Sequence, residues 1–197
     1  MSRYVQKLVV KNADIILTNT NENLRLLAGS GIKNAYEVYP GLNVHYNIPC
    51  FDGRQNISIS VTMWDYGRHP EKIAEIWEKI EIGKIYIVGS WTDNEYLNNF
   101  RDAIKAKVFC DKIVVTGRIS EEELLNLYKM VKVTVMFGYN KKNSGMDNLE
   151  AISLSLPLII NNGIGIKEVV RNEENGFIVN ETDTNKILET PPSNGGK

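Results

Sequence analysis

The 197-residue sequence predicts an α/β fold: a Rossmann-like parallel sheet with helices on both faces. From residue 56 onward, apolar strands alternate with amphipathic helices at regular spacing. The strands are continuously apolar, as in 84–88 (KIYIV) and 133–137 (VTVMF), which is typical of strands buried on both faces. Right-handed crossovers then place the strand-to-helix loops at one edge, where parallel sheets bind their ligands.

The first 50 residues are interpreted as the end of an N-terminal half and a crossing segment. Their predicted elements are a helix over 3–11, a strand over 13–18, a helix capped within 19–23 and ended at Gly29 or Gly31, and a strand over 36–39. Pro40-Gly41 is a turn signal that stops this last strand. The segment 41–55 lacks periodicity and is predicted to connect the two parts of the chain.

Residues 51–190 are predicted to form a Rossmann-like domain, followed by a disordered tail at 191–197 (PPSNGGK), which has no core-forming residue. Pro70 suits the first turn of a helix, and Ser120 with Glu123 forms a capping box before another. The predicted strands are 57–63, 84–88, 112–116, 133–137, 157–160 and 177–179. The predicted helices begin near residues 70, 93, 121, 145 and 166.

Composition excludes several classes of function. The formal net charge is -1 and the pI about 6.2, so no nucleic-acid partner is expected. No apolar run approaches the roughly 20 residues of a membrane span, and no export signal is evident, so a cytoplasmic protein is expected. The two cysteines match no metal or redox spacing, and no catalytic triad, metal cluster or P-loop can be assembled.

The stretch 133–168 carries the strongest sign of a binding site. Its first strand is followed by a polar loop with Lys141 and Lys142, and then by a helix that Ser144-Gly145 opens. A second apolar strand and a second glycine turn, Gly163-Ile-Gly165, precede another helix. Two helix N-termini at one edge of a parallel sheet are suited to an anion or a nucleotide.

The order of these loops resembles retaining glycosyltransferases of family 4, which have the GT-B fold. The resemblance covers roughly residues 56–180, the C-terminal, nucleotide-sugar-binding half in that family. Its motifs are Gly117-Arg-Ile-Ser-Glu-Glu-Glu-Leu, Ser144-Gly-Met-Asp-Asn-Leu-Glu-Ala, Pro157-Leu-Ile-Ile, Gly165-Ile-Lys-Glu-Val-Val and Asn175-Gly-Phe. Each motif alone is weak, but the last four keep the order and spacing of the family and together are specific.

The resemblance implies a role for each matching residue. Glu150 would accept hydrogen bonds from the nucleotide ribose, and the loop from Ser144 through Gly145 to Met146 would offer backbone N–H groups to the sugar or diphosphate. The turn Gly117-Arg118-Ile119 would line the base through backbone contacts. The alternative for Glu150 is an exposed glutamate on a helix, and the alternative for Gly145 and Met146 is an ordinary helix start. Arg118 could instead be a solvated charge. Glu168, two residues after the second glycine turn, is expected to stabilise a helix N-terminus, which is mainly a structural role.

Two positions depart from the family. Lys142 stands where the family has a glutamate that contacts the donor sugar. Arg68 takes the place of a lysine that binds the diphosphate, unless Pro70-Glu71-Lys72 is matched instead, which would give that role to Lys72. Arg68 is preferred, because the apolar residues of the helix then fall on its buried face. Arg68 and Lys142 are therefore the predicted catalytic residues, stabilising the leaving diphosphate; the alternative for Lys142 is a solvated lysine.

The predicted function is hexosyl transfer from a nucleotide-diphosphate sugar to a glycan, lipid or protein acceptor, with this chain as the donor-binding half. No cofactor and no metal is implied. The expected partners are a nucleotide sugar and an acceptor-binding half or partner subunit, through which the chain would associate peripherally with a membrane. The alternatives are a non-catalytic nucleotide-sugar-binding subunit of a split transferase and another GT-B enzyme, such as a sugar epimerase.

Replacing Lys142 with alanine tests the departure in the loop. If Lys142 supplies charge to the diphosphate, the Lys142→Ala variant binds a nucleotide-diphosphate sugar more weakly than the parent chain in calorimetric titration. An unchanged affinity contradicts this role and leaves a solvated lysine.

Overall fold

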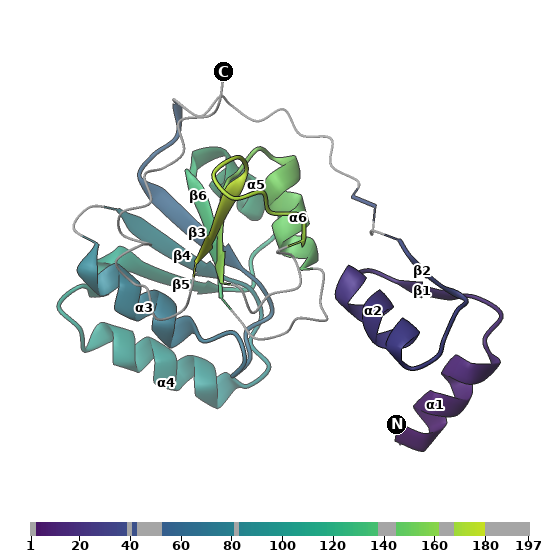
Figure 1. The fold of residues 1–197 in the computed structure, drawn as a ribbon. Helices are drawn as coiled ribbons and strands as arrows, with labels where there is room; N and C mark the ends of the chain where they lie inside the picture. Colours follow the sequence, from purple (N-terminus) through teal and green to yellow (C-terminus); the bar gives the residue numbers. More distant parts are fainter. Residues whose placement is uncertain are drawn as a thin grey trace.

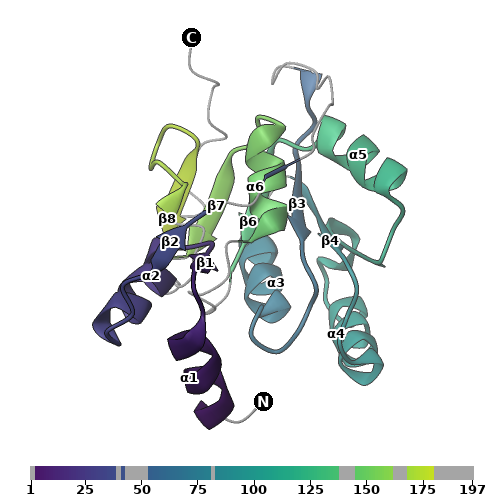
Figure 2. The ribbon, with the colours of Figure 1, turned by 90° about the vertical axis from the view of Figure 1, so that its right-hand side faces the viewer.

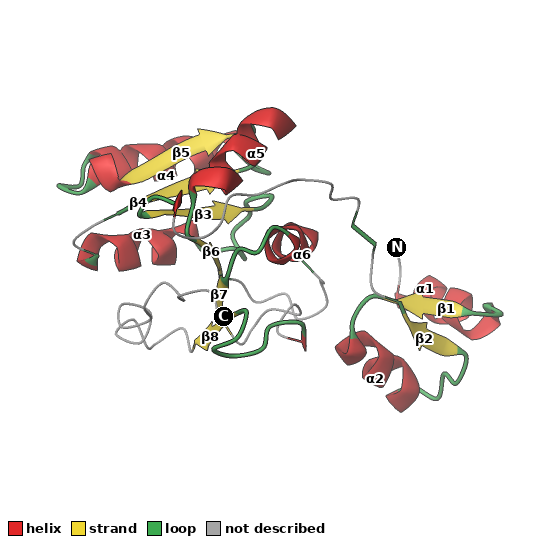
Figure 3. Cartoon of the chain, turned by 90° about the horizontal axis from the view of Figure 1, so that it is seen from above, coloured by secondary structure: helices red, strands yellow, loops and turns green. Residues whose placement is uncertain are grey.

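The computed structural model describes residues 3–38, 41–42, 53–80, 83–137, 145–161 and 168–179, with side chains from residue 8 onward. The described elements form a large parallel sheet with four helices, and a smaller unit near the N-terminus (Figure 1). Seen from above, the smaller unit lies to one side of the large sheet (Figure 3).

The large sheet has six strands, all parallel, in the order β5-β4-β3-β6-β7-β8. The strands are β3 (Ile57–Val61), β4 (Lys84–Val88), β5 (Ile113–Gly117), β6 (Val133–Met136), β7 (Leu158–Asn161) and β8 (Gly176–Val179). After β3 the chain adds β4 and β5 on one side, and after β6 it adds β7 and β8 on the other. The order therefore reverses between β3 and β6, and this reversal is the switch point of a Rossmann-type sheet.

Two helices cover each face of this sheet. One face carries α3 (Pro70–Lys79) and α4 (Asn94–Lys105), and the other carries α5 (Glu121–Met130) and α6 (Met146–Ser153). Figure 2 shows α6 over β6 and β7, the two strands that it contacts. This arrangement confirms the predicted fold class.

The strands are buried on both sides, as their continuous apolar character predicts. On β4, Ile85 and Ile87 enter the core beneath α3 and α4, while Tyr86 and Val88 pack on the α5 and α6 side. Trp77 of α3 is 3% exposed, and burying such a large apolar side chain contributes about 1.5–3 kcal/mol or more.

The predicted helix starts are observed. Pro70 is the first residue of α3, and its predicted apolar stripe is buried at Ile73, Ile76 and Trp77. The capping box of α5 forms: Ser120 N donates to Glu123 Oε2 at 2.8 Å, and Glu123 N donates to Ser120 Oγ at 3.2 Å. The start predicted for a helix near residue 166 lies outside the described residues.

The smaller unit is a parallel βαβ arrangement. It consists of α1 (Arg3–Asn12), β1 (Ile16–Thr18), α2 (Asn21–Gly29) and β2 (Ala35–Glu37), so both strands are shorter than predicted. Leu17 pairs with Tyr36, and side chains alternate along each strand, so four exposed apolar residues share one face of this sheet. They are Ile15, Leu17, Tyr36 and Val38, each 51–64% exposed. The helix α2 covers the opposite face.

A glycine after β4 lets the loops that follow β3 and β4 approach closely. Gly89 has φ 128°, and a β-carbon there would overlap the carbonyl oxygen of Thr62.

We expect Gly89→Ala to lower the free energy of unfolding by more than about 2 kcal/mol in urea titration. Gly53→Ala is the control, because a β-carbon at Gly53 has nothing within 4 Å. Equal stability of both variants would contradict the expectation.

Candidate functional site

The carboxyl ends of β3 and β6 lie side by side at the switch point, and the candidate site is built from the segments that follow them. After β3 comes the loop 62–69, which leads into α3. After β6 the next described element is α6, which begins at Met146. The predicted site residues Lys142 and Ser144 lie between β6 and α6 in the sequence, outside the described residues.

The start of α6 is shaped by Gly145. This residue has φ 60° and ψ 73°, and its carbonyl oxygen accepts hydrogen bonds from Asn148 N at 3.0 Å and Leu149 N at 3.2 Å. A β-carbon at Gly145 would lie 2.7 Å from Asn148 Nδ2, so both the conformation and the space favour glycine. The first backbone N–H groups of a helix carry partial positive charge, which here faces the switch point.

Arg68 is placed on the β3 side by a tight turn. Arg68 N donates to the carbonyl oxygen of Asp65 at 3.0 Å, and Gly67 N donates to Asp65 Oδ1 at 2.9 Å. The charge of Arg68 acts against the rise in the pKa of the Asp147 carboxyl, in the first turn of α6. That Arg68 and the start of α6 form two sides of one site remains a prediction.

Asp147 is a member of this site that the sequence did not single out. Burial raises the pKa of its carboxyl group, although the charge of Arg68 and hydrogen bonds from the Thr62 hydroxyl and its own backbone N–H act in the opposite direction. The only sequence sign was an acidic residue in a predicted first helical turn, which is common at helix starts. Its packing against Thr62 depends on the three-dimensional arrangement of β3 and β6.

Glu150 lies one turn further along α6 and is half-buried. Its pKa is raised by burial first, and then by the charges of Asp147 and Glu121. Beneath it is Tyr128 of α5, which is 1% exposed and whose hydroxyl has no hydrogen-bond partner among the described residues. Burial and the charges of Glu150 and Asp147 raise the pKa of Tyr128. A half-buried carboxylate at this position can accept hydrogen bonds from ligand hydroxyl groups.

The remaining predicted residues of the described part lie after β5, in the first turn of α3 and at the first position of α6. Gly117 ends β5 with φ 74°, Arg118 is exposed, and Ile119 packs against the core beneath α5 and α6. Lys72 lies in the first turn of α3 and is half-buried. Met146 is 41% exposed at the start of α6. The roles of these residues in binding remain predictions.

In the described part of the chain, no three His, Cys, Asp or Glu side chains gather in a way that could hold a metal ion. None of the described helices is long and apolar enough to cross a membrane.

Comparisons with known proteins show the family of the chain. The sequence profile of the family described as glycosyl transferases group 1 matches residues 51–190. A curated relative, an uncharacterised 41.2 kDa protein of the cps region of Klebsiella pneumoniae, is 23% identical over 94% of this chain and 53% of its own length.

Solved structures show the same fold. A sucrose-phosphate synthase from Thermosynechococcus elongatus superposes with a TM-score of 0.80 at 22% identity, over 94% of this chain and 50% of the synthase. HepE of Anabaena, solved in complex with UDP and glucose, superposes with a TM-score of 0.79 at 12% identity, over 94% of this chain and 55% of its own. The chain thus spans about half the length of the relatives it matches.

The raised pKa of Asp147 predicts a stability gain when its charge is removed. A raised pKa means that the folded state favours the protonated carboxyl group of Asp147. This protonated group stabilises the fold at low pH, and the stabilisation is lost as pH rises through the folded-state pKa. We expect Asp147→Asn to melt at a higher temperature than the parent at pH 7, and the difference to shrink below about pH 4.

Asp102→Asn is the control for this measurement. Asp102 is exposed and pairs only with Lys105 on the surface, so its removal is expected to change the melting temperature little. An Asp147→Asn variant that is less stable than the parent at pH 7 would contradict the expectation.

Proposed function

Because the chain belongs to the glycosyl transferases of group 1, we propose that it binds the nucleotide-diphosphate sugar of a retaining, family 4-type hexosyl transfer. The observation that supports this proposal is the switch point between β3 and β6: Arg68 lies in the loop after β3, and α6, which carries Glu150, follows β6. Parallel sheets hold nucleotides at this place, with phosphate at a helix N-terminus.

Each part of the site has a proposed role in binding. The N–H groups at the start of α6 and the guanidinium of Arg68 bind the diphosphate, with Lys142 adding charge. Glu150 accepts hydrogen bonds from the ribose hydroxyls, each contributing about 1.5–3 kcal/mol when desolvated. The turn of Gly117, Arg118 and Ile119 lies beside the base.

The same groups are proposed to promote the reaction. When the bond between the sugar C1 and the diphosphate oxygen breaks, negative charge develops on the departing diphosphate. Arg68, the N–H groups at the start of α6 and Lys142 are proposed to stabilise this charge without a metal ion.

The acceptor is proposed to bind to a second α/β half. Parallel sheets are normally covered on both faces, yet Leu17 and Tyr36 on the bare face of the β1–β2 sheet are each more than half exposed. We propose that further strands and helices of an acceptor-binding half cover this face. The chain by itself is then expected to transfer no sugar, and robust turnover by the purified chain would contradict this.

A second candidate is a nucleotide-sugar-binding subunit without catalytic activity. It is favoured by Lys142, which stands where the resembled family has a glutamate in contact with the donor sugar. A donor that binds here but is never consumed in the presence of the acceptor half would support this candidate.

The binding site is tested by calorimetry with UDP, GDP and ADP and their sugars. We expect one of these nucleotides to bind, and Arg68→Ala and Glu150→Gln each to weaken binding of its sugar about tenfold or more, because each loses a charge-assisted hydrogen bond.

Glu122→Gln is the matched control, since Glu122 is an exposed residue of the neighbouring helix α5. Binding of none of the nucleotides would overturn the proposed function. Equal losses in all three variants would show that the effect is not specific to the site.

A further inference from the structure

The start of α2 is capped by a carboxylate that lies 147 residues away in the sequence. Asn21 N donates to Glu168 Oε2 at 2.8 Å, and Glu22 N donates to Glu168 Oε1 at 3.1 Å, a separation of 146 residues. Glu168 lies on the connection between β7 and β8, and α2 belongs to the smaller N-terminal unit. These two hydrogen bonds join the two parts of the protein.

The contact completes the capping of α2. The first turn of a helix has backbone N–H groups without partners inside the helix. In α2 they belong to Asn21, Glu22 and Asn23, and the third donates to the Thr20 hydroxyl at 3.2 Å. A local side chain thus caps one donor, while Glu168 takes the other two with one oxygen each. The negative charge also interacts favourably with the helix dipole.

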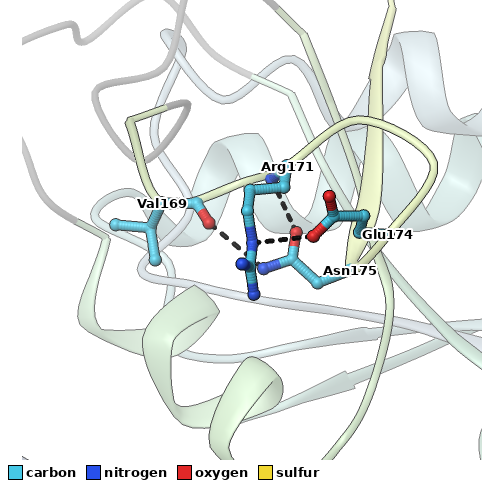
Figure 4. Close-up of polar contacts among 4 residues, drawn as sticks. All are labelled: Val169, Arg171, Glu174 and Asn175. Atoms are coloured by element: carbon cyan, nitrogen blue, oxygen red, sulfur yellow. Dashed lines mark hydrogen bonds and ion pairs between the residues drawn. The ribbon is translucent and has the colours of Figure 1, made fainter.

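The backbone beside Glu168 is held by its own hydrogen bonds (Figure 4). Asn175 Nδ2 donates to the carbonyl oxygen of Val169 at 3.1 Å, and Arg171 N donates to Asn175 Oδ1 at 2.7 Å. Arg171 Nε also lies 3.1 Å from Glu174 Oε2. Val170, 6% exposed, packs into the core of the large sheet. Glu168 therefore extends from a segment that is fixed to the large sheet.

This contact agrees with the structural role expected for Glu168 at a helix N-terminus and shows which helix is involved. Its two carboxylate oxygens bind two consecutive N–H groups of a helix in the other unit. Two hydrogen bonds to one planar group restrict both the distance and the orientation of the partner.

We propose that Glu168 is a positioning residue that joins the β1–α2–β2 unit to the large sheet and so sets the placement of one unit against the other. The inference does not depend on which donor is bound, or on whether one is bound. It predicts that the loss of the carboxylate changes the relative placement of the units and leaves the large sheet folded.

Spin labels measure this placement directly. Labels at Lys33→Cys, just beyond α2, and at Asn99→Cys, on α4, are both at exposed positions, in a chain whose own cysteines are replaced by Cys50→Ser and Cys110→Ser. We expect a narrow distance distribution for the parent and a distinctly broader one for Glu168→Ala. Glu78→Gln, an exposed glutamate of α3, is the control and is expected to match the parent.

Hydrogen exchange provides the second measurement. In Glu168→Ala, the amides of Asn21 and Glu22 are expected to exchange about tenfold faster, because their capping partner is lost. In Glu168→Gln one acceptor oxygen remains, so an intermediate effect is expected. This second variant keeps the test valid if Glu168→Ala fails to fold.

A parent-like distance distribution and parent-like exchange in both folded variants would overturn the proposal. Faster exchange with an unchanged distribution would also overturn it, because Glu168 would then stabilise α2 without positioning the unit. The outcome is separate from the proposed function, since neither measurement requires a nucleotide.

Discussion

The reversal of strand order between β3 and β6 is the constraint on which the rest of the structure depends. Because every crossover in a parallel sheet has the same hand, chains that add strands in opposite directions place their helices on opposite faces. Two helices therefore cover each face, and the segments that leave β3 and β6 diverge. Arg68 lies in the segment after β3, and α6 follows β6. Gly145, just before α6, has a positive φ, a conformation that favours glycine.

The site combines groups that do not favour one another. Asp147 and Glu150 are partly buried carboxyl groups on one helix. The charge of Asp147 raises the pKa of Glu150, and the charges of both raise the pKa of the Tyr128 phenol. A chain selected for stability alone would carry neutral side chains at these positions. Their presence at the carboxyl edge of a parallel sheet is typical of a place selected for binding.

Local patterns predicted the elements well, because strand periodicity, Pro70 and the Ser120–Glu123 capping box act within a few residues. Sequence could also place Gly145 and Glu150 on one helix start, since they are five positions apart. It could not predict the contact of Asp147 with Thr62, or that of Glu168 with α2, because these depend on how distant segments pack. The strand order was available only through resemblance, because the alternation of strands and helices is compatible with several orders.

The aromatic residues beside the site give the protein an optical property. The rings of Trp64 and Trp91, in the segments after β3 and β4, are stacked with centroids 5.8 Å apart, and the Trp64 indole N–H donates to the Val88 carbonyl oxygen at 2.9 Å. Tyr96 lies edge-on to Trp91, with centroids 5.0 Å apart. Trp64 is four residues before Arg68, in the same loop. Indole emission responds to the polarity and motion of its surroundings, so the intrinsic fluorescence of this chain is a native reporter of the state of that loop.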